Sequence, residues 1–218
     1  MAQLRFTLLA EGPTDIAFLP ILRWLVCQYA PPHVRVQDAW ADLGQLRDPP
    51  RELSSRIVGA VDLYPCDVLF VHRDADNQPP DCRYQEIGNA AAKATENGFQ
   101  LPYICVVPVR TQEAWLLTDA QALRRTAGNP NGRNVVVPPP LSRIESLPDP
   151  KNELYRLLRD ASGLHGRRLK KFRPEKLARL VPENMRTFEP LRTLLAFQRL
   201  ERDVQTVIAG WAASRDPA

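Results

Sequence analysis

The sequence DVLFVHRDAD at residues 67–76 decides the expected fold. Its first six residues are mostly apolar, which is typical of a short strand buried within a sheet. The charged stretch RDAD follows directly, so we expect the strand to end at His72. Functional side chains of open parallel sheets gather just beyond the carboxyl ends of the strands. Residues 67–76 therefore predict a buried strand that carries two aspartates at such an edge.

Outward from this strand, apolar runs and helical patterns alternate along the chain. Further strands are expected at residues 4–9, 34–40 and 101–107. Helices are expected at residues 16–28, 43–60 (broken by two prolines), 83–97 and 111–125. This order predicts an α/β fold with a mostly parallel sheet flanked by helices.

The pattern changes in the second half of the chain. Residues 128–150 contain Asn-Pro-Asn-Gly and three consecutive prolines, which predict an irregular connector. Beyond it, helical segments are expected at residues 152–162, 174–180 and 188–213. We therefore expect an α/β core at residues 1–127, a connector at 128–150, and a basic helical C-terminal region at 151–218 packed on the core.

Composition places the chain among ordinary globular proteins. Of its 218 residues, 44% are hydrophobic and 25% are charged, which argues against global disorder. Its apolar runs are shorter than the about 20 residues that a membrane span needs. The first residues show no signal-peptide pattern, and the four cysteines form no Cys-x-x-Cys pair. We expect reduced thiols and a cytoplasmic location, and no zinc site.

Three carboxylates are expected to meet at the carboxyl edge of the sheet. Glu11 follows the first strand, and Asp74 and Asp76 follow the strand at 67–72. Residues two apart in an extended segment point the same way, so both aspartates are expected to face one ion. Carboxylate oxygens are ligands that Mg²⁺ prefers. The competing interpretation is a turn or helix-capping role for each acid, and Asp15 is expected to be a first-turn helix residue.

Two further residues are candidates for the same chemistry. Glu113 follows the strand at 101–107 and is a candidate second metal ligand or general base. Its alternative is a first-turn helix carboxylate with Thr111 as the cap. His72 is expected to be a core residue at the end of its strand, with a general base as the alternative.

Short motifs around these acids resemble a known domain type. LAEGPTD at residues 9–15 and VHRDAD at 71–76 look like the glutamate and Asp-x-Asp motifs of TOPRIM domains, which have a Rossmann-like sheet. The chain is more closely similar to the domain of unknown function 4276 family, a TOPRIM-like bacterial family. PVRTQEAWLLTD at 108–119, DPK at 149–151 and RRLKK at 167–171 add to this resemblance.

The resemblance implies a site and a set of partners. It implies Mg²⁺ (or Mn²⁺) held by Glu11, Asp74 and Asp76, with Glu113 nearby. The related overcoming-lysogenization-defect (OLD) nucleases use a lysine after the acidic motifs, for which Lys170 and Lys171 are both counterparts. Such nucleases carry or accompany an ABC-type ATPase. This sequence has no phosphate-binding Gly-x-x-x-x-Gly-Lys loop, so the ATPase is expected to be a separate polypeptide. A role in antiviral defence of bacteria follows by analogy.

The charge distribution adds a candidate nucleic-acid surface. Residues 1–109 carry 9 basic and 13 acidic side chains, whereas residues 110–218 carry 20 and 12. Lysine and arginine bind phosphates without regard to sequence. The candidate phosphate contacts lie within HGRRLKKFRPEKLAR at residues 165–179, and they are Arg167, Arg168, Lys170, Lys171, Arg173 and Lys176. The alternative is a solvated helix face with Leu169, Phe172 and Leu177 turned inward.

These observations favour a metal-dependent nuclease that hydrolyses DNA or, as the lesser expectation, RNA. A second hypothesis is a non-catalytic regulatory or nucleic-acid-binding subunit of an ATPase complex. A third is phosphatase or nucleotidyl chemistry on small molecules, since Asp-x-Asp also follows a strand in haloacid-dehalogenase-like phosphatases. That chemistry requires an aspartate after the first strand, where this chain has Glu11.

Overall fold

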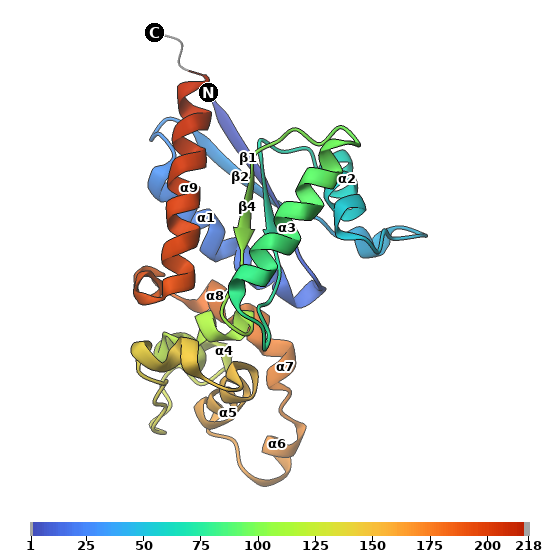
Figure 1. Ribbon diagram of the computed structural model, residues 1–218. Coiled ribbons are helices and arrows are strands. Elements are labelled where there is room, and N and C mark those ends of the chain that lie inside the picture. Colours follow the sequence, from blue (N-terminus) through green and yellow to red (C-terminus); the bar gives the residue numbers. More distant parts are fainter. Residues whose placement is uncertain (1, 216–218) are drawn as a thin grey trace. The chain divides into compact units, whose positions relative to one another are not determined.

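The computed structural model describes residues 2–215 and contains one parallel sheet of four strands (Figure 1). The strands are β1 (Gln3–Leu9), β2 (Arg35–Trp40), β3 (Val68–His72) and β4 (Tyr103–Val106). Their order across the sheet is β2-β1-β3-β4, and every pair is parallel. The expected α/β class, with a parallel sheet flanked by helices, is confirmed.

The connections between strands are helical, as parallel pairing requires. A short 3-10 helix η1 (Pro13–Ala17) leads into α1 (Phe18–Tyr29) between the first two strands. Between β2 and β3 lie η2 (Leu43–Gln45) and α2 (Leu53–Leu63), separated at the two prolines that the sequence marks as a break. The helix between β3 and β4 is α3 (Pro80–Thr95), which begins at Pro80, a residue whose fixed φ suits the first helical position.

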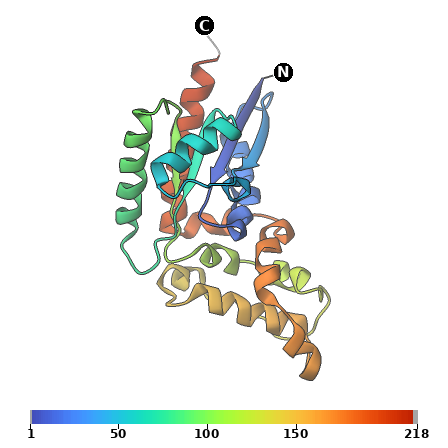
Figure 2. The same ribbon diagram turned by 90° about the vertical axis from the view of Figure 1, so that its right-hand side faces the viewer.

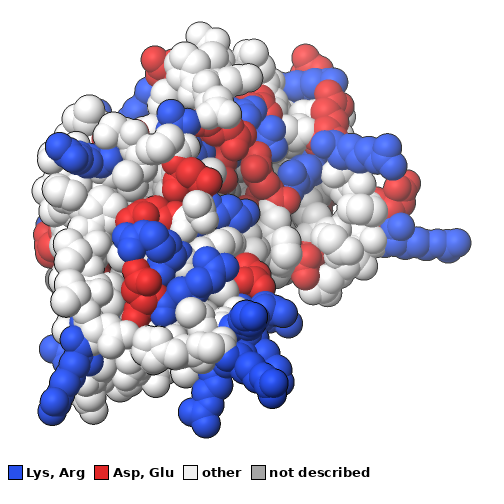
Figure 3. Space-filling model, turned by 90° about the horizontal axis from the view of Figure 1, so that it is seen from below, with Lys and Arg blue, Asp and Glu red and all other residues white. Residues whose placement is uncertain are grey.

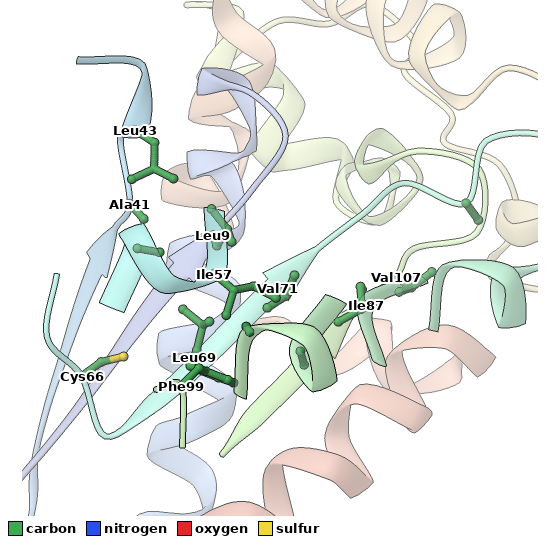
Figure 4. Close-up of a cluster of buried hydrophobic side chains, with 14 residues drawn as sticks. Leu9, Ala41, Leu43, Ile57, Cys66, Leu69, Val71, Ile87, Phe99 and Val107 are labelled. Carbon is green, nitrogen blue, oxygen red and sulfur yellow. The ribbon is translucent and has the colours of Figure 1, made fainter. Parts of the chain in front are cut away.

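Both faces of the sheet are buried. One hydrophobic cluster joins Leu9, Leu69 and Val71 of the sheet to Ile57 of α2 and Ile87 of α3 (Figure 4). Because side chains alternate along a strand, the neighbouring residues of β1 and β3 face the other way. Helix α1 and the long C-terminal helix α9 (Leu195–Ala213) run along that second face (Figures 1 and 2).

From Arg199 onward, α9 belongs to the same compact unit as the sheet. The Arg199 guanidinium lies 3.4 Å above the Tyr84 ring, and it also forms a 2.7 Å ion pair with Asp81. The Tyr29 hydroxyl donates a 2.8 Å hydrogen bond to Glu201. Contacts with α1 and α3 thus tie the last helix to segments far away in sequence.

A second compact unit spans Pro108–Gln198 and is helical. Its elements are η3 (Gln112–Leu117), α4 (Ala120–Thr126), η4 (Leu141–Ser146), α5 (Pro150–Ser162), α6 (Gly166–Lys171), α7 (Pro174–Leu177), η5 (Ala178–Leu180), α8 (Val181–Asn184) and η6 (Glu189–Thr193). Trp115 is fully buried, and its ring meets that of Phe197 edge to face at 5.3 Å.

This division differs from the expected boundaries at residues 127 and 151. The sheet unit ends at Val107, because η3 packs against α5 and Trp115 packs on Phe197. The expected connector at 128–150 contains the helical turn η4, and the segment from Arg199 joins the sheet unit. Within residues 2–215, no helix has both the length and the apolar character needed to cross a membrane.

Candidate functional site at the carboxyl edge of the sheet

The loops that follow β1 and β3 leave the sheet at the same edge. The two strands are neighbours and parallel, and Leu9 is the register partner of Val71. Glu11 therefore emerges beside Arg73, the residue that precedes Asp74. This adjacency is what the sequence-based site requires, and it comes from pairing between segments about sixty residues apart.

Glu11 is ion-paired to an arginine. Arg73 Nη1 lies 2.7 Å from Glu11 Oε1, and Arg73 Nη2 lies 2.7 Å from Glu86 Oε1 of α3. Burial raises the pKa of Glu11, Arg73 opposes that rise, and the carboxylates of Asp15 and Asp76 add to it. Glu11 and Asp76 are thus close enough to repel each other, as expected for members of one acidic site.

The two aspartates of the Asp-x-Asp motif contact different side chains. Asp74 Oδ1 lies 3.5 Å from His72 Nε2, whereas Asp76 Oδ2 accepts a 3.0 Å hydrogen bond from Arg83 Nη2. Asp76 has a φ of 54°, in the left-handed region, so the segment is not extended at this residue. The expected extended conformation is therefore wrong at Asp76, and the binding of one ion by both carboxylates stays a prediction.

His72 is fully buried at the end of β3, and its expected place in the core is confirmed. Its ring contacts that of Phe18, with 4.6 Å between centroids. Nδ1 lies 2.9 Å from the backbone oxygen of Val106, which can only accept, so Nδ1 carries the proton and donates. Burial lowers the pKa of His72. The remaining nitrogen, Nε2, is buried and has no hydrogen-bond partner among residues 2–215.

Asp15 is the second carboxylate that faces this nitrogen. Its Oδ2 lies 3.8 Å from His72 Nε2 and accepts a 2.9 Å hydrogen bond from the backbone N–H of Gly12. Asp15 is buried in the first turn of η1, so the expectation of a first-turn helix residue is confirmed. Sequence reasoning missed its contact with His72, although its position four residues after Glu11 in the same loop was a signal.

Three arginines surround these acids, and sequence reasoning assigned none of them. Arg73 bridges Glu11 and Glu86, while Arg83 donates 2.8 Å hydrogen bonds to the backbone oxygen of Asp74 and to Glu86 Oε2. Arg56 of α2 donates to the backbone oxygen of Ala10. The edge therefore carries alternating charges rather than carboxylates alone, which removes much of their mutual repulsion.

The remaining predicted acid, Glu113, belongs to the second unit. It is buried in the first turn of η3, and Thr111 stands at the N-cap position without a side-chain capping bond. The pKa of Tyr155 of α5 is raised mainly by burial of the phenol. Lys151 opposes this rise, and the charge of Glu113 adds to it. The first-turn interpretation is confirmed, and a role with the acids of the sheet unit stays a prediction.

The basic segment also lies in the second unit. Its six candidate phosphate contacts are all exposed, and Leu169, Phe172 and Leu177 are partly buried, as the solvated-helix alternative expects. Among residues 2–215, Arg167, Arg168, Lys170, Lys171 and Lys176 make no ion pair, whereas Arg173 lies 3.9 Å from Glu175. Figure 3 shows lysine and arginine side chains projecting at the margins of the view, with acidic and basic side chains interspersed over the rest of that face. The free cations remain available to an anionic partner.

The carboxylate oxygens at this edge suit a hard divalent cation, and His72 Nε2 has no hydrogen-bond partner within the described residues. A complete coordination shell is not preformed, since within residues 2–215 no three or more His, Cys, Asp or Glu side chains are grouped to hold a metal. Ligation by Glu11 requires its release from Arg73. The residues that could hold an ion are Glu11, Asp15, His72, Asp74 and Asp76.

Comparisons with protein-family models, with curated proteins and with solved structures give no match to this chain.

Proposed function

We propose that this chain is a TOPRIM-like, metal-dependent nuclease that hydrolyses phosphodiester bonds of DNA or RNA. One observation carries the proposal: β1 and β3 are adjacent parallel strands, so Glu11 and Asp74 leave the sheet at one edge. Burial is the main cause of the raised pKa of Glu11, and the nearby carboxylates of Asp15 and Asp76 add to it, which supports a shared acidic site. Sites of open parallel sheets lie at this edge.

A Mg²⁺ or Mn²⁺ ion held by Glu11, Asp74 and Asp76 would supply an activated water and charge stabilisation at the leaving oxygen. The chain's own residues have separate tasks. Arg73 and Arg83 hold the carboxylates in place without an ion. Both guanidiniums present the planar donor geometry that binds phosphate oxygens, so they can hold the scissile phosphate once a carboxylate releases them.

Binding of the polymer is assigned to the basic segment at residues 165–179. Its exposed lysines and arginines, of which only Arg173 has an ion-pair partner among residues 2–215, fit the sequence-independent grip on phosphates that a nuclease needs. A catalytic role for Lys170 or Lys171, and for Glu113, is also part of the proposal, and it rests on the sequence resemblance alone. A separately encoded ABC-type ATPase and a role in antiviral defence remain part of the proposal, and they rest on the sequence resemblance.

The direct test is cleavage of plasmid, single-stranded DNA and RNA with Mg²⁺ or Mn²⁺. Asp74→Asn removes one proposed ligand charge and is expected to lower the rate at least a hundredfold. The matched control is Asp62→Asn, an exposed aspartate near the end of α2, which is expected to cleave like the wild type. If the wild type leaves all three substrates intact, alone and with its neighbouring ATPase, the nuclease proposal fails.

A specific observation favours a second candidate, a non-catalytic regulatory subunit. Arg73 and Arg83 already pair with Glu11, Asp76 and Glu86, as in a purely structural network. In that case Asp74→Asn would retain function in host cells, and a pull-down from the native host would recover a stoichiometric ATPase. A nuclease predicts loss of function in the same cells.

A further inference from the structure

We infer that His72, Asp15 and Asp74 form a site for a divalent first-row transition-metal ion, such as Mn²⁺ or Zn²⁺, with His72 Nε2 as the nitrogen ligand. All three residues belong to the sheet unit. The inference does not require that the protein cleave nucleic acid, although Asp74 is shared with the proposed function.

The first argument is the orientation of the imidazole. Its Nδ1–H is committed to the backbone oxygen of Val106 at 2.9 Å, which leaves Nε2 as the acceptor of the neutral ring. Metal-binding histidines commonly donate their other ring N–H to a carbonyl in this way, because that bond fixes the tautomer and the ring orientation. His72 is thus arranged as a metal ligand whose free nitrogen faces the site.

The second argument is electrostatic. Nε2 is buried, has no hydrogen-bond partner in the described part of the chain, and faces Asp74 Oδ1 at 3.5 Å and Asp15 Oδ2 at 3.8 Å. A lone pair directed at two carboxylates is unfavourable unless a positive species lies between them. A proton on Nε2 would create a charged imidazolium in a fully buried position, at a desolvation cost. A divalent cation would give Nε2 a partner and would offset the charges of both carboxylates.

The third argument is spacing. Metal–nitrogen and metal–oxygen bonds of about 2.0–2.2 Å place neighbouring tetrahedral ligands roughly 3.4 Å apart. The distances from Nε2 to the two carboxylate oxygens are 3.5 and 3.8 Å, so each differs from this ligand-to-ligand distance by only a few tenths of an ångström. The shell is not preformed, and it closes when the two carboxylates turn toward Nε2.

The donor set selects the kind of ion. Imidazole nitrogen suits transition metals, whereas Mg²⁺ prefers oxygen ligands and retains its waters. Asp15 and Asp74 add two oxygens and two negative charges. The side chain of Asp74 is 18% exposed and those of His72 and Asp15 are 0% and 8% exposed, so an ion would enter past Asp74.

The test is calorimetric titration of the full-length protein with Mn²⁺ and with Mg²⁺. We expect one Mn²⁺ site whose Kd is at least tenfold lower than that for Mg²⁺. Asp15→Asn keeps the side-chain oxygen that caps Gly12 but removes a ligand charge, and it is expected to weaken Mn²⁺ binding at least tenfold. Asp62→Asn is the matched control and is expected to bind like the wild type.

A second measurement does not depend on any variant. In nitrogen NMR spectra of histidine-labelled protein, His72 Nε2 is expected to give a lone-pair signal that shifts when Zn²⁺ is added. Protonated Nε2 that ignores Zn²⁺ would overturn the inference, as would Mn²⁺ affinity unchanged by Asp15→Asn. If the protein binds Mn²⁺ as expected but cleaves no nucleic acid, only the nuclease proposal fails. If it cleaves nucleic acid with Mg²⁺ but has no Mn²⁺ site that depends on Asp15, only this inference fails.

Discussion

At the scale of single residues, Arg73 compensates the charge of the acidic edge. Its guanidinium bridges Glu11 and Glu86, each at 2.7 Å, and its side chain is 22% exposed. If the arginine is removed, the two carboxylates remain partly desolvated but lose the attraction to its positive charge. Arg73 therefore stabilises the fold in the ion-free state, in which it pairs with Glu11 and Glu86.

We predict that Arg73→Gln lowers the free energy of unfolding at pH 7 by about 1–2 kcal/mol, between the values for exposed and buried pairs. Urea denaturation measures the change. Arg73→Lys keeps the charge but not the two-carboxylate bridge, and it is expected to lose less. Equal stability of the wild type and both variants would show that this network contributes nothing.

Single residues are also where sequence reasoning was most incomplete. Glu11 and Asp74 were found because each directly follows an apolar strand, which is a local signal. Arg56, Arg73 and Arg83 were missed, because a charge that pairs across the fold looks the same in sequence as a solvated one. The contact between Asp15 and His72 joins the β1 and β3 loops, and only the pairing of those strands reveals it.

At the scale of elements, the strands were predicted within a few residues, because a buried strand must be an apolar run. The six-residue helix α6 was not delimited, since it has no fully buried residue and so no apolar face. The motif DPK at 149–151 has a structural explanation, since the Asp149 side chain accepts a 2.9 Å hydrogen bond from Asn152 N–H and Pro150 opens α5.

The cap on α5 gives a prediction for Asp149. Replacing it with alanine leaves a helix N–H without its partner and is expected to cost about 1 kcal/mol of stability. Asp149→Asn keeps a capping oxygen and is expected to stay within about 0.5 kcal/mol of the wild type. Urea denaturation of both variants measures this difference. The motif is structural if Asp149→Asn cleaves nucleic acid normally and Asp149→Ala only loses stability. If both variants lose activity equally and keep their stability, that interpretation is contradicted.

The same helix has a pH-sensitive ion pair. Arg156 donates to Glu153 at 2.7 Å, and this hydrogen bond lowers the pKa of Glu153. A carboxyl whose pKa is lower in the folded state adds stability above its unfolded pKa, about 4.3, and loses it as the pH falls through the folded value. Because Arg156 is 53% exposed, the contribution is expected to be about 0.2–1 kcal/mol.

We predict that Glu153→Gln is less stable than the wild type at pH 6 and that the difference shrinks toward pH 3. Thermal unfolding across this pH range measures it. Glu183→Gln, an exposed glutamate of α8, changes the same charge and is the control. A difference between Glu153→Gln and the wild type that stays constant with pH would show that the ion pair does not titrate in this range.

At the scale of the whole molecule, the chain divides into a sheet unit and a helical unit at a place that the sequence does not mark. Pro108 follows β4 without a linker-like stretch, and the residues that assign η3 to the helical unit are Trp115 and Phe197, about eighty positions apart. The composition-based connector at 128–150 looked like a boundary because its prolines and glycines resemble linkers. Tertiary packing, rather than local composition, sets the division.

The charge asymmetry leads to a prediction for the whole molecule. Each phosphate contact made by a lysine or arginine adds about 0.9 to the slope of log affinity against log salt for duplex DNA. Lys170 and Lys171 are exposed and unpaired among residues 2–215, so neutralising them disrupts no ion pair. If both touch phosphates, the double change to glutamine lowers the slope by about 2 and weakens binding at low salt.

Fluorescence anisotropy of a labelled duplex at several salt concentrations measures this slope. The matched control neutralises Arg47 and Arg133, two exposed arginines outside the basic segment, and so changes the net charge equally. Long-range attraction depends on net charge and would change equally in both double variants, whereas direct contacts lower the slope only when Lys170 and Lys171 are removed. Equal slopes in both variants would place the nucleic acid elsewhere, and binding that is insensitive to salt would remove the basic segment from the proposed function altogether.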